Sequence, residues 1–271
     1  MSWSWKRTII LIMSVAMLYV VGVLYLYIFI DHIVFQPRHL AQNQSPVFTN
    51  SAKHVILSHP DKEVIDNYHF IQKAGTSKGC MIFFHGYKGN IDDWNAYIDY
   101  FYDQGYDVFA PEYRGYGRSA YNSSEIHMYE DATLAMAYVR KQYREDSILV
   151  YGVDIGAVVA AYTNMSIPNR MTVLENPVYG IKNWLYKKFP ALWLHLELKY
   201  DFIIQEYLPN AISPTFILAS KKNEFATQSE LNQMRNQLKD RNKFSWIDQT
   251  NIENDKQFPP IEQLNLILSY E

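Results

Sequence analysis

The sequence predicts an α/β domain, in which helices cover both faces of a mostly parallel sheet, preceded by one transmembrane helix. Two observations carry this prediction. Strand-like and helix-like segments alternate over more than 150 residues, and the chain begins with a long uncharged apolar run. Because 48% of the 271 residues are hydrophobic, the chain can also bury a sizeable core. The length allows one large domain or two small ones, and no repeat or second linker divides it.

The apolar run at the start contains 23 residues without a charge, Thr8 to Ile30. As a helix it would extend about 34 Å, enough to cross a hydrocarbon core of about 30 Å. A cleaved signal peptide is the alternative, but its apolar region has about 7–15 residues and ends in small residues at a cleavage site. This run instead ends in bulky side chains. We therefore favour an uncleaved signal anchor.

The charges beside the span predict its orientation. Lys6 and Arg7 precede the apolar run and Asp31 follows it, and positive residues stay on the cytoplasmic side. A single-pass membrane protein is expected, with its globular domain on the far side, which is periplasmic, lumenal or extracellular. The following polar, turn-rich stretch is typical of a tether. The expected parts are a cytoplasmic N-terminus (1–7), a transmembrane anchor (8–30), a tether (31–52) and an α/β domain (53–271).

The domain itself is expected to alternate strands and helices. Six short apolar segments are predicted strands: Cys80–Phe84, Tyr106–Ala110, Ser147–Tyr151, Met171–Leu174, Thr215–Leu218 and Phe244–Ile247. Five segments have helical spacing: Trp94–Gln104, Met128–Tyr143, Ala157–Asn164, Ser229–Leu238 and Ile261–Tyr270. The aromatic-rich segment from Gly180 to Leu208 interrupts this order. We expect it to form a small helical insertion over the carboxyl ends of the strands, where open α/β sheets bind ligands.

A turn between a predicted strand and helix has the spacing of a nucleophile elbow. Gly152 and Gly156 stand two residues before and two residues after Asp154. Small residues at these places allow a tight strand-to-helix turn, which lifts the central side chain above the sheet beside a helix N-terminus. The central residue here is an aspartate instead of a serine.

With this elbow the chain resembles the α/β-hydrolase superfamily, in particular its serine-aminopeptidase-like branch, many members of which are membrane-tethered. Three further elements, in the same order, carry the resemblance. They are Phe83–Asn90, similar to the His-Gly oxyanion loop, Pro111–Ser119, similar to the Arg-Gly-Tyr-Gly-x-Ser turn, and Ser124–Ala132, similar to the entry of the next helix. The resemblance implies an α/β-hydrolase fold over about residues 65–270.

The resemblance also implies a catalytic triad, whose three positions all depart from the family pattern. The nucleophile position is Asp154 and the acid position is Asn223. The histidine would lie in the loop of residues 250–255, which holds Glu253 but no histidine, and no histidine follows His195 in the sequence. A degenerate triad is therefore expected, and with it a pseudoenzyme with a ligand-binding or scaffolding role.

The alternative is a hydrolase of an ester, amide or peptide bond that uses Asp154 as nucleophile with a displaced base. Some relatives with an aspartate at the elbow form an ester intermediate, which a base must then help water to cleave. His195 in the insertion is one candidate base, and Glu253 or Asp255 is another. The alternative for His195 is that it is an ordinary, partly exposed histidine without a catalytic role.

The elbow aspartate also has a structural interpretation. The helix N-terminus should stabilise its charge and lower the pKa of the Asp154 carboxyl. Lys88 is expected to reach over and form an ion pair with it, filling the oxyanion pocket. The candidate binding residues are His85, Gly86, Tyr87, Lys88, Ile155 and His195.

Composition excludes several other classes. A net charge of −3 and a pI near 6.2 argue against nucleic-acid binding, which needs clustered Lys and Arg. Cys80 is the single cysteine, which rules out an internal disulfide and a Cys-rich metal site. No cluster has metal-ligand spacing, and no loop has a phosphate-binding pattern, so no metal or cofactor is expected. The expected partners are the membrane, through the N-terminal helix, and a small-molecule or peptide ligand.

Overall fold

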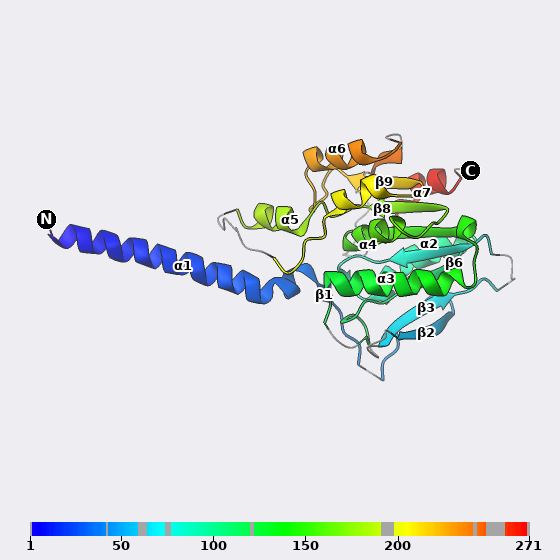
Figure 1. Ribbon diagram of the computed structural model, residues 1–271. Coiled ribbons are helices and arrows are strands. Elements are labelled where there is room, and N and C mark those ends of the chain that lie inside the picture. The colour runs from blue at the N-terminus through cyan, green and yellow to red at the C-terminus, as the bar shows by residue number, and fades with distance from the viewer. Residues whose placement is uncertain are drawn as a thin grey trace.

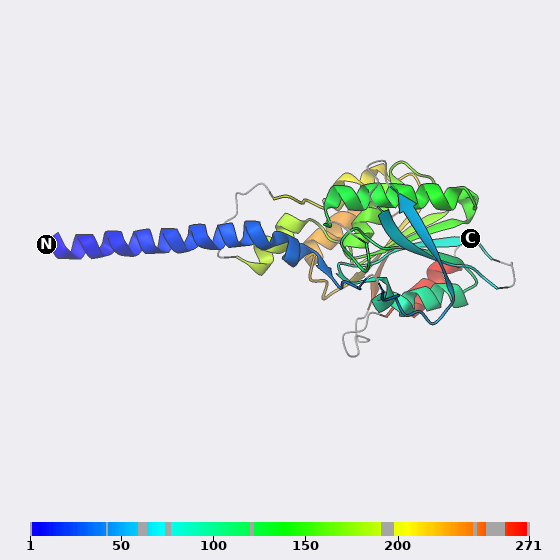
Figure 2. The same ribbon diagram turned by 90° about the horizontal axis from the view of Figure 1, so that it is seen from below.

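A twisted sheet with helices on both faces forms the domain, and one long helix leaves it (Figures 1 and 2). The computed structural model describes residues 2–41, 43–58, 64–73, 77–119, 122–190, 198–240, 243–247 and 258–269. Within these residues, eight strands form one sheet in the order β10-β9-β8-β7-β4-β6-β3-β2. Their bounds are β2 Ala52–Ser58, β3 Val64–Phe70, β4 Cys80–Phe84, β6 Asp107–Pro111, β7 Ile148–Val153, β8 Met171–Glu175, β9 Thr215–Ser220 and β10 Phe244–Ile247.

All six strands that the sequence predicts lie in this sheet. They are the neighbours β10, β9, β8, β7, β4 and β6, and each adjacent pair is parallel. The sequence analysis missed β2 and β3, which add an antiparallel edge beside β6. The helices are α1 Ser2–Val34, α2 Asn95–Asp103, α3 Glu125–Arg140, α4 Ile155–Asn164, α5 Ile181–Lys188, α6 Gln228–Gln237 and α7 Ile261–Leu268. The predicted α/β-hydrolase fold, with its mostly parallel sheet, is confirmed.

Two apolar layers cover the two faces of the sheet. Successive side chains of a strand point to opposite faces, so Ile82 and Phe84 of β4 pack on one side while Met81 and Phe83 pack on the other. The first face is covered by α3 and α4, and the second by α2 and α7. This arrangement leaves the carboxyl ends of the parallel strands open for loops.

The N-terminal helix α1 has the length and composition of a membrane span. An 18-residue window within its stretch Trp5–Val34 has a mean hydropathy of 2.6, and most of the side chains of α1 are exposed. Figure 1 shows it projecting away from the sheet. Only its last turns contact the domain, where Leu26, Ile30 and Val34 are buried.

The segment after α1, which the sequence predicts as a tether, is bonded to the domain along its first part. Strand β1 (Gln36–Pro37) pairs in parallel with β5 (Lys88–Gly89), in the loop that follows β4. The N–H of Arg38 donates to Gly89 O at 2.7 Å, and that of Leu40 donates to Gly117 O at 2.7 Å. These loops follow β4 and β6, so α1 joins the domain at the carboxyl edge of the sheet.

The predicted insertion between Gly180 and Leu208 contains α5 and the 3₁₀ turn Ile204–Glu206. In Figure 1, α5 lies at the same end of the domain as the end of α1. Residues 191–197, which include the candidate base His195, lie outside the described residues.

Candidate functional site

The backbone of the nucleophile elbow is fully formed. Asp154 joins β7 to α4 with φ 53° and ψ −114°, a conformation that costs a non-glycine residue about 1–3 kcal/mol. A Cβ added at Gly152 would lie 2.2 Å from Gly156 O, and one added at Gly156 would lie 2.2 Å from Phe84 O. Glycine is therefore required at both places, because the helix packs directly on the strands.

The Asp154 carboxyl lies against the oxyanion loop. A Cβ added at Gly86 would stand 2.7 Å from Asp154 Oδ2, which shows how closely the two segments approach. Within the part of the chain that the structure describes, no hydrogen-bond donor or ion-pair partner contacts this carboxyl. Asp154, which would be the nucleophile only if the protein is a hydrolase, thus has no side-chain partner among the described residues.

The electrostatic surroundings of Asp154 differ from the expectation. Although part of the residue reaches solvent, protein surrounds most of it, and this desolvation raises the pKa of its carboxyl well above the usual range. The neighbouring carboxylates Glu175 and Glu224 add to the rise, and Lys88 opposes it only weakly. The expectation that the helix N-terminus lowers the pKa of Asp154 is therefore wrong, because desolvation and the two neighbouring carboxylates raise it.

The expected ion pair between Lys88 and Asp154 is also not formed. Lys88 belongs to β5, its side chain is exposed, and its Nζ lies 5.1 Å from the centre of the Tyr87 ring. Among the described residues, no ion pair within 4.0 Å joins it to Asp154. The oxyanion pocket is therefore not filled by a salt bridge.

A second carboxyl beneath the elbow was missed by the sequence analysis. Glu175 ends β8, opposite Val153 of β7, and is buried. It accepts a hydrogen bond from Tyr97 Oη at 3.0 Å and another from Tyr151 Oη. Burial raises the pKa of Glu175 to about 7 in spite of these two donors. An acidic residue directly after a buried strand was the signal for it, but the predicted strand ended at Leu174.

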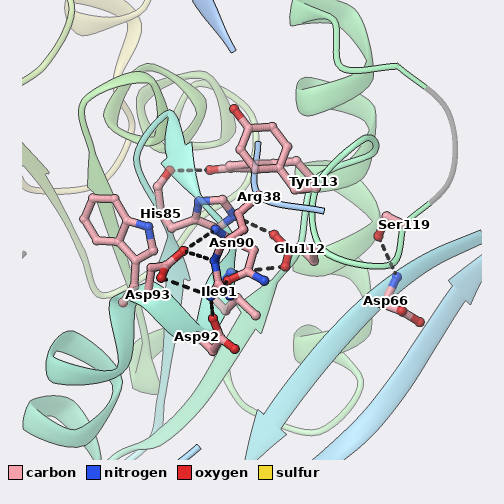
Figure 3. A network of polar contacts seen from close by, with 12 residues as sticks. Arg38, Asp66, His85, Asn90, Ile91, Asp92, Asp93, Glu112, Tyr113 and Ser119 are labelled. Atoms are coloured by element: carbon pink, nitrogen blue, oxygen red, sulfur yellow. Dashed lines mark hydrogen bonds and ion pairs between the residues drawn. The ribbon is translucent and has the colours of Figure 1, made fainter. Parts of the chain in front are cut away.

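The oxyanion loop is fixed by the turn that follows β6 (Figure 3). His85 contacts Gly86 O through Nδ1 at 2.8 Å and Glu112 Oε1 through Nε2 at 3.0 Å. Tyr113 Oη donates to His85 O at 2.9 Å, and the other carboxylate oxygen of Glu112 accepts from the N–H of Ile91. Both ring nitrogens of His85 are engaged, so this histidine positions the loop and has no nitrogen left to act as a base.

Two backbone N–H groups stand at the positions that form the oxyanion hole in this type of turn. In hydrolases with this elbow, the oxyanion is bound by the N–H after the nucleophile and by one from the loop after the preceding strand. The corresponding groups here belong to Ile155 and Tyr87. Ile155 is the first residue of α4, so its N–H has no acceptor within the helix. The N–H of Tyr87 has no acceptor among the described residues.

The turn after β9 brings a different residue to the site than the one predicted. Asn223, at the acid position, uses its Oδ1 to accept from the N–H of Phe225 at 2.8 Å and so stabilises its own turn. The next residue, Glu224, accepts from Tyr87 Oη at 2.9 Å and thereby reaches the oxyanion loop. Glu253 and Asp255 fall in residues 248–257, outside the described part of the chain.

No described histidine contacts Asp154. Apart from His85, the described histidines with hydrogen-bond partners are bonded elsewhere: His54 to Asp66, His69 to Tyr138 and Tyr143, and His127 to Asn122 O. Nor do the described residues contain a group of three His, Cys, Asp or Glu side chains that could hold a metal ion. In the described residues, the elbow has neither a histidine that could act as base nor a metal-binding cluster beside it.

Comparisons with known proteins agree with the fold. The family described as "Serine aminopeptidase, S33" matches residues 75–244. Protein bem46 of Schizosaccharomyces pombe is 29% identical over 149 residues, which are 53% of this chain and 50% of that protein. Human alpha/beta hydrolase domain-containing protein 17B is 24% identical over 112 residues, 40% of this chain and 39% of that protein. The chain thus spans about half or less of the length of these relatives.

Solved structures share the fold at low sequence identity. An esterase of Pyrococcus furiosus superposes with a TM-score of 0.61 at 17% identity, over 79% of this chain and 87% of that one. An acetyl xylan esterase from Paenibacillus sp. R4 gives 0.63 at 16% identity, over 84% and 85%. Likeness at this level of identity supports the architecture alone.

Proposed function

The chain belongs to the serine aminopeptidase (S33) family of α/β-hydrolases, and from that premise we propose that it is a membrane-anchored member that binds a ligand at its elbow without hydrolysing it. The observation that carries the proposal is the Asp154 carboxyl, which has a raised pKa and no described partner. A nucleophilic carboxylate must be ionised, and the ester it forms must then be cleaved with the help of a base. The raised pKa disfavours the ionised form of Asp154, and no described histidine stands beside it to serve as the base.

The same geometry favours a ligand with a carbonyl or carboxylate oxygen. The N–H groups of Tyr87 and Ile155 are two donors without described acceptors, as in an oxyanion pocket. Because its pKa is raised, Asp154 keeps its proton to a higher pH than an ordinary carboxyl and can donate a third hydrogen bond. Three donors at one place fit an oxygen acceptor on the ligand.

Anchoring by α1 completes the proposal. The helix would cross the membrane over about Thr8 to Ile30, with Lys6 and Arg7 on the cytoplasmic side and the domain on the other side. A ligand-binding domain held in this way serves as a receptor or scaffold at the membrane surface.

A hydrolase that uses Asp154 as nucleophile remains the second candidate, favoured by one observation. The positive φ of Asp154 is retained at an energetic cost, and such strain is found mainly at functional sites. On this alternative, one of the carboxylates near the elbow would have to act as base. Glu224 is the described residue that reaches the rim.

One experiment separates the two candidates. The full chain in detergent is incubated with activated esters, epoxides and haloalkanes, and thermal shifts are measured with small carboxylates and amides. We expect no turnover and a saturable thermal shift that Asp154→Ala reduces, whereas the exposed control Asp146→Ala does not. Turnover that Asp154→Ala abolishes would overturn the binding proposal in favour of the hydrolase.

Membrane topology is tested separately, with the buried Cys80 giving little background. Ser2→Cys and Lys141→Cys are each labelled in sealed vesicles of known orientation with a membrane-impermeant maleimide. Lys141 is exposed on the domain. We expect the two sites to be labelled from opposite sides of the membrane. Labelling of both from one side, or release of the chain by alkaline carbonate, would refute the anchor.

A further inference from the structure

A cavity lies apart from the elbow, beside the end of the anchor helix. It has a volume of about 360 Å³, within the range of about 300–1,000 Å³ that small-molecule sites occupy. The N-terminal end of α3 forms one wall through Glu125 and Tyr129. The C-terminal part of the insertion forms the other, through Lys199, Tyr200 and Tyr207 among others.

One wall of this cavity is bonded directly to α1. Tyr200 Oη donates to Asp31 Oδ1 at 2.9 Å, and Lys199 Nζ lies 3.4 Å from Asp31 Oδ2. The same Nζ lies 5.6 Å from the centre of the Tyr27 ring, which belongs to the apolar run. The rings of Phe35 and Tyr200 pack edge to face with their centres 5.0 Å apart. Asp31 is the first residue after the apolar run, so this wall stands where the membrane surface would meet the domain.

Charge is ordered along the cavity. Lys199 contacts Asp31 at the end of the anchor, whereas the exposed carboxylates Asp201 and Glu206 come later in the same lining, where Tyr207 contacts Tyr129 of α3. Glu125 is already occupied, since it accepts from the N–H groups of Asp201 and Phe202 at 2.7 and 2.8 Å. The cavity therefore has a positive group on the membrane side. Its carboxylates Asp201 and Glu206, unlike Glu125, accept no hydrogen bond from a described backbone N–H.

Aromatic side chains complete the far end. Tyr207 packs edge to face on Tyr129, with ring centres 5.8 Å apart, and its hydroxyl contacts that of Tyr129 at 3.2 Å. Tyrosine faces beside carboxylates attract ammonium groups, including quaternary ones. A lysine amine is a common point contact for phosphate. The cavity thus offers a phosphate contact near the membrane and an ammonium site farther from it.

We propose that this cavity binds the headgroup of a zwitterionic phospholipid, with its phosphate at Lys199 and its ammonium between Tyr207 and Glu206. The order of the charges matches such a lipid, whose phosphate lies nearer to the acyl chains than its ammonium does. The inference rests on the proposed anchoring by α1, because the anchor brings the cavity to headgroup level. It does not depend on what binds at Asp154.

The test uses the full chain in maltoside detergent and a soluble probe that needs no bilayer. Glycerophosphocholine is titrated calorimetrically, with glycerophosphoglycerol as the probe that lacks an ammonium. We expect saturable binding of the first and at least tenfold weaker binding of the second. Glu206→Gln combined with Tyr207→Leu should weaken glycerophosphocholine binding at least tenfold, while the exposed control Glu262→Gln leaves it unchanged.

A second arm identifies the source of the headgroup. The chain is extracted from nanodiscs of mixed phosphatidylcholine and phosphatidylglycerol, and retained lipid is identified by native mass spectrometry. Preferential retention of phosphatidylcholine is expected. Equal binding of both glycerophosphodiesters, no binding of either by a folded chain, or binding of the soluble probe without retained lipid would each overturn the proposal. Release of the chain by carbonate would instead refute the anchor, so the two failures are distinguishable.

Discussion

Two neighbouring parts of the carboxyl edge differ in how their polar groups are bonded. The loop around His85 is held by Glu112 and Tyr113, which both bond to His85 (Figure 3). Tyr116 Oη also donates to Tyr87 O in this loop. The carboxyl of Asp154, on the adjacent turn, has no described partner. The residues that shape a hydrolase site are thus bonded into the fold, whereas the residue that would carry the chemistry is not.

This difference shows which constraints still act on the edge. A buried polar group that loses its partner costs several kcal/mol, so residues such as Glu112 are fixed by the stability of the fold. A carboxyl without described partners, such as that of Asp154, is not held in this way by the stability of the fold. The elbow can therefore change its chemistry while the loop beside it keeps the family pattern.

The largest expected effect follows from removing a partner in the bonded loop. Glu112→Ala leaves the Nε2 of His85 and the N–H of Ile91 buried without acceptors, and should lower the free energy of unfolding by about 3–5 kcal/mol. Urea denaturation of the full chain in detergent measures it. Glu112→Gln, which keeps the volume and one acceptor, should cost less. A loss no greater than that of the exposed Glu145→Ala would contradict the comparison.

A smaller effect, visible mainly as pH dependence, is expected beneath the elbow. The pKa of Glu175 is about 7 in the fold against a reference of 4.5, so the folded state binds this proton more tightly than the unfolded state. Its contribution to stability is complete below about pH 4.5 and is lost as the pH rises through about 7. Glu175→Gln should flatten this slope. The free energy of unfolding of the variant, measured against that of wild type, should be about 1–3 kcal/mol higher at pH 8 than at pH 4.5.

Thermal melts of wild type and Glu175→Gln between pH 4.5 and 8 check this sign. The variant should keep one acceptor for the hydroxyls of Tyr97 and Tyr151. The control is Glu262→Gln, an exposed carboxyl that should leave the slope unchanged. A slope of the same size in Glu175→Gln would show that Asp154 or another group carries the pH dependence.

The sequence predicts the six parallel strands well because each of them is a short apolar run, which is visible in the residues of the strand alone. It predicts the elbow because Gly152 and Gly156 are required by close backbone contacts, which leave a trace in the residue types. The charge state of Asp154 could not be predicted in this way. It depends on Glu175 and Glu224, which are 21 and 70 residues away in sequence and meet it only through the order of the strands.

The attachment of the tether escaped the sequence analysis for a related reason. Residues 36–40 are polar and turn-rich, which is typical of a linker, and nothing local indicates that β1 pairs with β5. The pairing is completed by Arg38, whose guanidinium bonds to Asn90 at the end of the oxyanion loop and to Asp92 and Asp93 in the 3₁₀ turn that follows. Long-range pairing of two short segments has no periodic signal.

The smallest expected effect concerns this attachment. Arg38→Ala removes the ion pairs to Asp92 and Asp93, but the Arg38 side chain is 47% exposed, so solvent and salt screen them. We expect a loss of about 0.2–1 kcal/mol in urea denaturation at low salt, shrinking at high salt. The backbone bonds of β1 remain, so protease cleavage between 31 and 52 should rise only modestly. The control Arg144→Ala, whose pair with Asp146 is far more exposed, should change neither measurement. If Arg38→Ala instead destabilised the chain as much as Glu112→Ala, the contrast between the two attachments would be wrong. The pairing of the tether would then hold the oxyanion loop in place, as Glu112 does.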